Sequence, residues 1–319
     1  MSGRLQSTLA WARRRYLEPE YPLLAVELRS DSIGVVRLQR EGSGLALKAA
    51  ALQELPPGTL VPSLAQPNLV APAAFGAALR VALERAGALG LTRACLVLPD
   101  TAGRMALLPA DELAGKRRAQ VDELVRFRLR KTLPFDVGEA QIATLPLGHS
   151  DAGALLPTAA VARAVLEQYE TALAQAGLQV GLVELAGWVC FAAATRGRPA
   201  EDRLVINWDS GYVTLLLARN GRPVLVRSLS GQAVAAEADV AREIFNTVLY
   251  YRERLGGTGL AGATLRSAAL PPADVVELLR EPLGFEAEIL DPWASRPVPA
   301  LPLPESLGLA LAAVLGRAA

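Results

Sequence analysis

Two short polar turns, each directly after an apolar strand, contain the residues of this sequence best suited to chemistry. The first follows Glu27 and is Arg29-Ser30-Asp31-Ser32; the second is Asn207-Trp208-Asp209-Ser210-Gly211. When two such turns face one cleft from opposite sides, their backbone N–H groups can bind the phosphate chain of a nucleotide. The first question is therefore whether the chain places these turns opposite each other.

The strands around the turns occur twice in the chain. In residues 23–52 an apolar strand, a polar turn, a second apolar strand and a glycine turn lead into a third strand. Residues 204–229 repeat this order, with Asn220-Gly221 as the second turn. A duplicated three-stranded meander predicts two matched lobes, each contributing one polar turn to a shared cleft.

Apolar periodicity predicts the remaining elements. The expected helices are 75–83, 111–133, 158–176, 185–195, 237–255, 273–283 and 307–315. The expected further strands are 94–98, 104–108, 140–147, 178–184, 263–268 and 286–290. The strands around helix 111–133 are interpreted as a subdomain inserted in the first lobe.

The composition argues against several classes of protein. With 319 residues and 51% hydrophobic content, the chain can form two domains, and its net charge of +1 argues against nucleic-acid binding. One histidine, His149, and two distant cysteines, Cys95 and Cys190, argue against a transition-metal site, a disulfide framework and a hydrolase triad. No catalytic residue and no metal ligand is assigned. No apolar run reaches the roughly 18 residues of a spanning helix, so a cytoplasmic location is expected.

The charged stretch 196–203 is the best boundary between two lobes. The expected domains are a leader at 1–20, a first lobe at 21–198 with an inserted subdomain at about 94–156, a second lobe at 199–303 and a C-terminal helix at 304–319 that returns to the first lobe. The leader joins Leu5, Leu9 and Trp11 to Arg13-Arg14-Arg15. An interfacial amphipathic helix and a packed or loose arm are both open readings of it.

The segment Gly257-Thr258-Gly259-Leu260-Ala261-Gly262 matches the dinucleotide-binding fingerprint letter for letter. That fingerprint requires a strand before the turn and a helix after it, whereas here a predicted helix precedes and a predicted strand follows. We therefore interpret the segment as a helix-to-strand connection.

The order of elements, with four short motifs, resembles the PilM family over nearly the whole chain after residue 20. The motifs are Pro134-Phe135 after a helix, Ala176-Gly177-Leu178 between a helix and a strand, Asn220-Gly221 followed by Arg227 and Gly231, and Tyr251-Arg252 at a helix end. PilM is the actin-like cytoplasmic protein of type IV pilus assembly, related in fold to FtsA and to the cytoplasmic part of GspL proteins. The resemblance implies an α/β, actin-like, two-lobed fold of the hexokinase and FtsA type, with duplicated β-meander sheets.

The resemblance also implies a site for ATP with magnesium. The residues at the positions of its phosphate motifs are Glu27, Ser30, Ser32, Asn207, Asp209, Gly211, Thr214 and Gly231. This chain departs from the family's Asp-x-Gly, because the first motif has Glu27 and Arg29 and the second has Asn207 and Asp209. The paired glycine of the adenosine motif is absent from 266–270, where side chains would keep the backbone away from a purine. These departures predict a cleft without efficient ATP hydrolysis, in which weak nucleotide binding stays open.

The function implied is that of an adaptor at the inner face of the cytoplasmic membrane. The implied partner is the cytoplasmic N-terminal segment of a PilN-like bitopic membrane protein, seated between the main sheet of the first lobe and the inserted subdomain. Arg126, Phe127 and Arg130 are the candidate partner-binding residues. Self-association stays open, and membrane contact is expected to be peripheral. The alternative function is an ATPase or phosphotransferase on the same fold, in which Glu27 or Asp209 organises magnesium.

Overall fold

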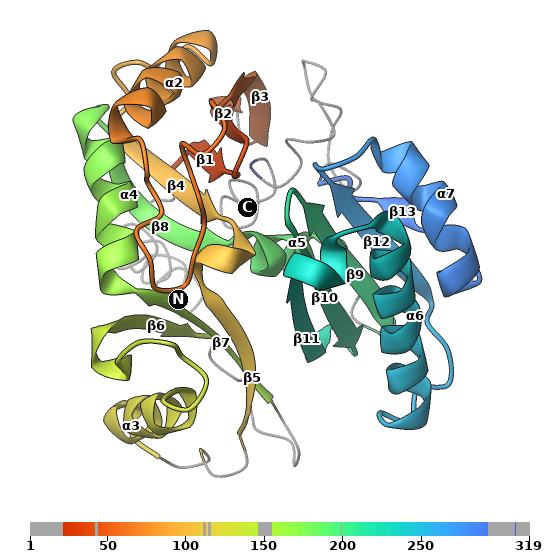
Figure 1. The fold of residues 1–319 in the computed structure, drawn as a ribbon. Coiled ribbons are helices and arrows are strands. Elements are labelled where there is room, and N and C mark those ends of the chain that lie inside the picture. Colours follow the sequence, from red (N-terminus) through yellow and green to blue (C-terminus); the bar gives the residue numbers. More distant parts are fainter. Residues whose placement is uncertain are drawn as a thin grey trace, which may run out of the picture.

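Two five-stranded sheets with the same strand order form the two lobes of the molecule (Figure 1). The computed structural model describes residues 22–41, 44–110, 113, 116–145, 155–198, 200–292 and 310. The first sheet has the order β3-β2-β1-β4-β8 and the second β11-β10-β9-β12-β13. The strands are β1 (Leu24–Leu28), β2 (Ser32–Glu41), β3 (Gly44–Glu54), β4 (Arg93–Leu98), β8 (Gln179–Leu185), β9 (Arg203–Asp209), β10 (Tyr212–Arg219), β11 (Arg222–Ser230), β12 (Gly262–Ser267) and β13 (Glu288–Ile289). The predicted duplication is confirmed.

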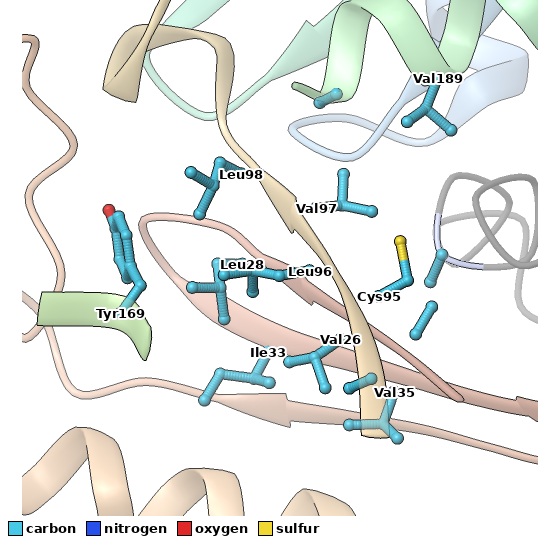
Figure 2. Close-up of a cluster of buried hydrophobic side chains, with 14 of the residues drawn as sticks. Val26, Leu28, Ile33, Val35, Cys95, Leu96, Val97, Leu98, Tyr169 and Val189 are labelled. Atoms are coloured by element: carbon cyan, nitrogen blue, oxygen red, sulfur yellow. The ribbon is translucent and has the colours of Figure 1, made fainter. Parts of the chain in front are cut away.

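Each meander is antiparallel and its next strand pairs in parallel with the first. In the first lobe β1 pairs with β2 antiparallel and with β4 parallel; in the second lobe β9 pairs with β10 antiparallel and with β12 parallel. All residues of β1 are buried, and Val26 and Leu28 lie in a cluster with Ile33 and Leu96 (Figure 2). A central strand covered on both faces is apolar throughout, which is why these runs could be identified as strands.

The helix α5 (Ala186–Thr195) lies between the two lobes (Figure 1). It is apolar on all sides, and it contacts β8 of the first lobe as well as β9 and β10 of the second. Residues of the second sheet, including Val205 and Leu216, consequently belong to the same hydrophobic core as the first sheet. A helix that is apolar all round must be buried on every side, so α5 holds the lobes together.

The inserted subdomain is a three-stranded sheet of order β5-β7-β6, covered by α3 (Arg118–Leu129). Its strands are β5 (Arg104–Pro109), β6 (Ala140–Thr144) and β7 (Leu155–Ala162). Two expectations need correction. Strand 94–98 is β4 of the main sheet, not part of the insertion, and residues 158–162 are strand rather than helix, because β7 pairs with both β5 and β6.

Besides α3 and α5, the described α-helices are α2 (Pro72–Arg85), α4 (Arg163–Gln175), α6 (Glu237–Glu253) and α7 (Pro272–Leu283). Four of these helices are shorter than expected or differ by one or two residues, whereas α2 extends beyond its expected range at both ends, and α4 begins after strand β7. The expected helix 111–133 is α3, which begins only at Arg118. Predictions for the leader 1–20, His149 and all of 304–319 except Ala310 fall outside the described residues. None of the described helices combines the length and apolar character that a membrane crossing requires.

The glycine-rich segment 257–262 connects α6 to β12, as its context predicted. The Tyr251 hydroxyl donates to the carbonyl oxygen of Gly259 at 2.9 Å, and a Cβ added at Gly257 would overlap the Tyr251 ring. The glycine at 257 is therefore required by packing against a ring and not by a dinucleotide.

Replacing Gly257 with alanine is expected to destabilise the protein by about 1–3 kcal/mol, because the added methyl group forces the buried Tyr251 ring to move. Chemical denaturation measures the change. The control is Gly259→Ala, where an added Cβ would contact nothing within 4 Å. Equal losses in both variants would contradict the steric explanation.

Candidate functional site

Strand register brings three polar side chains of the second sheet into one row. Asn207 on β9 lies opposite Thr214 on β10 and opposite Arg266 on β12. Asp209 lies two residues beyond Asn207, on the same face of β9, because side chains alternate along a strand. Asn207, Asp209, Thr214 and Arg266 are all buried. The row faces the first lobe, where Glu27 ends the apolar run of β1.

The guanidinium of Arg266 joins the two lobes. It donates to Glu27 Oε1 from the first lobe and to Asp209 Oδ2 and Asn207 Oδ1 from the second, the last at 3.1 Å. The side chains of Arg266, Glu27 and Asp209 are 1%, 1% and 3% exposed. Charged groups this deeply buried are stable only when they are paired. We call Glu27, Arg29, Arg266, Asp209 and Asn207 the inter-lobe ion-pair network.

Glu27 has two further partners. Its Oε1 accepts a hydrogen bond from Arg29 Nε at 2.8 Å, and its Oε2 accepts one from the backbone N–H of Ala310 at 3.1 Å. Burial alone raises the pKa of Glu27, but the positive charges of Arg29 and Arg266 outweigh it and lower this pKa below its ordinary value. The carboxylate is therefore ionised and fully engaged by partners within the protein.

Asp100 extends the network into α5. It lies in a short 3₁₀ helix after β4, and its Oδ1 accepts from the backbone N–H of Gly187 at 2.7 Å. Its Oδ2 accepts from Asn207 Nδ2 at 3.0 Å, which is a second hydrogen bond between the lobes. A Cβ at residue 187 would lie 2.8 Å from Asp100 Oδ2, so this approach requires glycine. Burial raises the pKa of Asp100 despite the hydrogen bonds it accepts.

The two polar turns touch each other. Ser210 Oγ in the second turn donates to Asp31 Oδ2 in the first turn at 2.6 Å, and Ser32 Oγ donates to the other oxygen of Asp31 at 2.7 Å. Gly211 has a left-handed φ of 81°, which lets β9 reverse into β10 within two residues. Because the two turns are in direct contact, there is no room for a phosphate chain between Ser210 and Asp31.

A magnesium–phosphate group does not fit the residues as they lie. Its best oxygen ligands, Glu27 and Asp209, are bound to the Arg266 guanidinium, and a cation there would meet a positive charge. The structure brings together Glu27, Asn207, Asp209 and Thr214 in the cleft, and Ser32 and Gly211 at the touching turns. Ser30 lies half-buried in the first turn, and Gly231, at φ 61°, starts the 3₁₀ helix after β11. Within the described residues, neither takes part in the network.

Of the candidate partner residues, Arg126 and Phe127 lie on α3 and Arg130 caps its C-terminal end. Arg126 donates to the carbonyl oxygen of Val137 at 2.7 Å, which links α3 to the segment before β6. Phe127 is 63% exposed and Arg130 is exposed. The helix covers the sheet face that contains Leu156 and Ala160, whereas Val161 packs into the first lobe's core from the opposite face. α3 therefore lies on the sheet face opposite Val161, and a partner-binding role for the three residues stays a prediction.

Arg266 and Asp100 were not among the site residues predicted from the sequence. The available signal for Arg266 was an arginine within the apolar strand 263–268, since a buried arginine must have a carboxylate partner. Asp100 follows Leu98-Pro99 at the end of a predicted strand, a place where side chains of α/β folds meet a shared cleft. Neither signal identifies the partner.

The structure is similar to known structures of the actin-like class. No protein-family model matches the sequence, and no curated protein is detectably similar to it. A PilM–PilN type IV pilus biogenesis complex is similar with a TM-score of 0.73 and 21% identity, over 94% of this chain and 98% of that chain. A protein of unknown function with an actin-like ATPase fold from Bacteroides thetaiotaomicron has a TM-score of 0.53 and 9% identity, over 90% and 95%. The cytoplasmic domain of EpsL, an inner membrane component of the Vibrio cholerae type II secretion system, has a TM-score of 0.52 and 10% identity, over 92% and 94%.

The two sheets of matching strand order define a protein of the actin-like fold. Within that class, the PilM-type architecture covers nearly the whole chain. The predicted resemblance is thereby confirmed at the level of fold.

Proposed function

We propose that this chain is a non-catalytic, actin-like adaptor of a type IV pilus or related secretion assembly, which binds the cytoplasmic N-terminal segment of a PilN-like membrane protein. The likeness to a PilM–PilN complex over nearly the whole chain supports the partner class. The observation that carries the non-catalytic role is the inter-lobe ion-pair network. Through its partner, the chain would work at the inner face of the cytoplasmic membrane.

The network opposes the alternative ATPase or phosphotransferase. Phosphoryl transfer needs carboxylates that hold magnesium and a base that reaches the attacking hydroxyl. Glu27 and Asp209 instead neutralise Arg266, and Asp100 accepts from Gly187 and Asn207. No carboxylate among these three is left for chemistry, so the cleft supports a structural and not a catalytic role.

The junction face of the subdomain sheet offers a seat for the partner segment. Ala143 of β6 lies opposite Ala159 of β7, which lies opposite Met105 of β5. Ala143 is exposed, Ala159 is half-buried, and Leu107 on the same face is half-buried. Met105 and Ala159 on this face pack with the core that contains the first sheet, and β5 and β7 also contact β11 of the second lobe. A few apolar side chains of the partner segment inserted along this strip would supply most of the affinity.

Titration with a peptide of the first residues of a neighbouring PilN-like protein tests the proposal. Saturable binding is expected, and Ala143→Glu is expected to weaken it about tenfold or more, because the bound segment would bury the new charge at this exposed position. The matched controls are Phe127→Ala on the outer face of α3 and Phe245→Ala on α6, both on exposed side chains and both expected to leave affinity unchanged. No binding, or loss only in Phe127→Ala, contradicts the junction site.

Thermal unfolding with Mg-ATP tests the non-catalytic role separately. No rise in melting temperature is expected at millimolar Mg-ATP, because a ligand stabilises a protein only when it binds the folded state. A melting temperature that rises with the concentration of Mg-ATP would contradict a nucleotide site closed by the inter-lobe ion-pair network and would favour the enzyme alternative.

A further inference from the structure

The side chain of Arg266 occupies the place between the carboxylates of Glu27 and Asp209 that a magnesium ion would need. We propose that Arg266 is an internal cation that takes the structural place of a bound metal–nucleotide and keeps the two lobes closed without any ligand. This inference does not depend on the partner that the adaptor binds.

The geometry around Arg266 is that of a filled cation site. Oxygens from Glu27, Asp209 and Asn207 converge on one guanidinium from both lobes. Carboxylate and amide oxygens are the ligands that a hard metal cation prefers, and a guanidinium fork can bridge two carboxylates with charge-assisted hydrogen bonds. The site therefore contains the ligands for a cation, and the chain itself supplies the cation.

Charge explains why the lobes need this cation. Glu27 and Asp209 approach from opposite lobes and are both buried, so without a positive charge between them they would repel each other. Burial opposes the charge of Arg266, but Asp209 and Glu27 raise its pKa further above its already high ordinary value. The guanidinium stays protonated wherever the carboxylates are ionised, and closure does not vary with the supply of a ligand.

Two further contacts favour the same closed arrangement. Ser210 donates to Asp31 across the turns, and Asn207 donates to Asp100 beneath them. In addition, Ala310, close to the C-terminus in sequence, donates its N–H to Glu27. The Ser210–Asp31 and Asn207–Asp100 hydrogen bonds both join the two lobes, so opening the lobes would break them together with the Arg266 bridge.

Arg266→Gly tests the proposal, because it removes the cation and leaves the oxygen ligands with free space. We expect a melting temperature lower by about 5–15 °C and a larger radius of gyration in small-angle X-ray scattering. Millimolar methylguanidinium chloride is expected to restore at least half of the lost melting temperature and the smaller radius. Tetramethylammonium chloride at the same concentration is expected to restore neither, since it donates no hydrogen bonds.

Arg203→Ala is the matched control. Arg203 is 3% exposed and pairs with Glu201 and Glu288 within the second lobe alone. The Arg203→Ala variant is expected to have a lower melting temperature and an unchanged radius of gyration. Methylguanidinium is expected not to restore its melting temperature. Restoration equal to that of Arg266→Gly would overturn the assignment of a specific inter-lobe site.

Arg266→Lys keeps the inference testable if the glycine variant does not fold. Lysine retains the charge but loses the fork, so this variant is expected to keep the compact radius with a smaller loss of melting temperature. An open Arg266→Lys variant, or a compact Arg266→Gly variant that methylguanidinium does not stabilise, would overturn the proposal.

Discussion

Glu27→Gln is expected to lower the free energy of unfolding by about 3–5 kcal/mol near neutral pH. Glutamine keeps the size of the side chain and one acceptor oxygen but removes the negative charge between Arg29 and Arg266. Both arginines pair with Glu27 in the wild type, and the side chain of Arg266 is 1% exposed. The cost is that of leaving a buried positive charge without one of its counter-ions.

The loss should depend on pH in the acid range. The pKa of Glu27 is lower in the folded protein than its ordinary value of 4.5, so its ionised form adds stability above that value. This contribution is lost as the pH falls below 4.5 and passes the folded-state pKa. The difference in free energy of unfolding between wild type and Glu27→Gln is therefore expected to be constant near neutral pH and to narrow under acid conditions. Urea unfolding at a series of pH values measures this difference.

Glu277→Gln is the control for this experiment. Glu277 on α7 pairs with Arg280 at 3.0 Å, but its side chain is 71% exposed. Exposed ion pairs contribute about 0–1 kcal/mol, so the same chemical change should have little effect there. If the two variants lose equal stability, burial of Glu27 is not the cause of the loss.

Asn207→Asp is expected to cost about 2–4 kcal/mol near neutral pH, because it places two carboxyl groups within hydrogen-bonding distance. In the wild type the amide of Asn207 donates to Asp100 Oδ2 at 3.0 Å. Two carboxyl groups can form a hydrogen bond with each other only if one of them keeps its proton and donates it. Burial already raises the pKa of Asp100, and the new charge would raise it further.

The sign of the pH dependence follows from that rise. A carboxyl whose pKa is raised in the folded state destabilises the protein as the pH rises through the ordinary pKa of that carboxyl. The loss of free energy of unfolding in Asn207→Asp should therefore shrink toward acid pH. Urea unfolding at several pH values measures it, with Asn246→Asp on the exposed face of α6 as the control. An Asn207→Asp variant as stable as the wild type at neutral pH would show that Asn207 and Asp100 do not meet. This substitution also restores an aspartate that the resemblance leads one to expect at residue 207.

The periodic elements could be predicted closely from the sequence. The two meanders, α5, α6 and α7 have patterns that depend on residues close in the chain, and the structure confirms all of them. Residues 158–162 were misassigned to a helix because Val161 and Val165 have the spacing of a helix face. In the structure Val161 packs from a strand and Val165 from α4, so one stripe belongs to two elements. Pairing with β5 and β6, far away in the sequence, decided that boundary.

By itself the sequence determined the duplicated meanders, their polar turns and the absence of the expected glycines, because strand alternation and turn chemistry are local properties. Only the tertiary structure decided what fills the cleft. Arg266 meets Glu27 across 239 positions of sequence, and Asn207 meets Asp100 across 107. Contacts at such separations follow from how α5 packs between the two sheets, and no spacing of residues along the chain encodes which buried charge will face which.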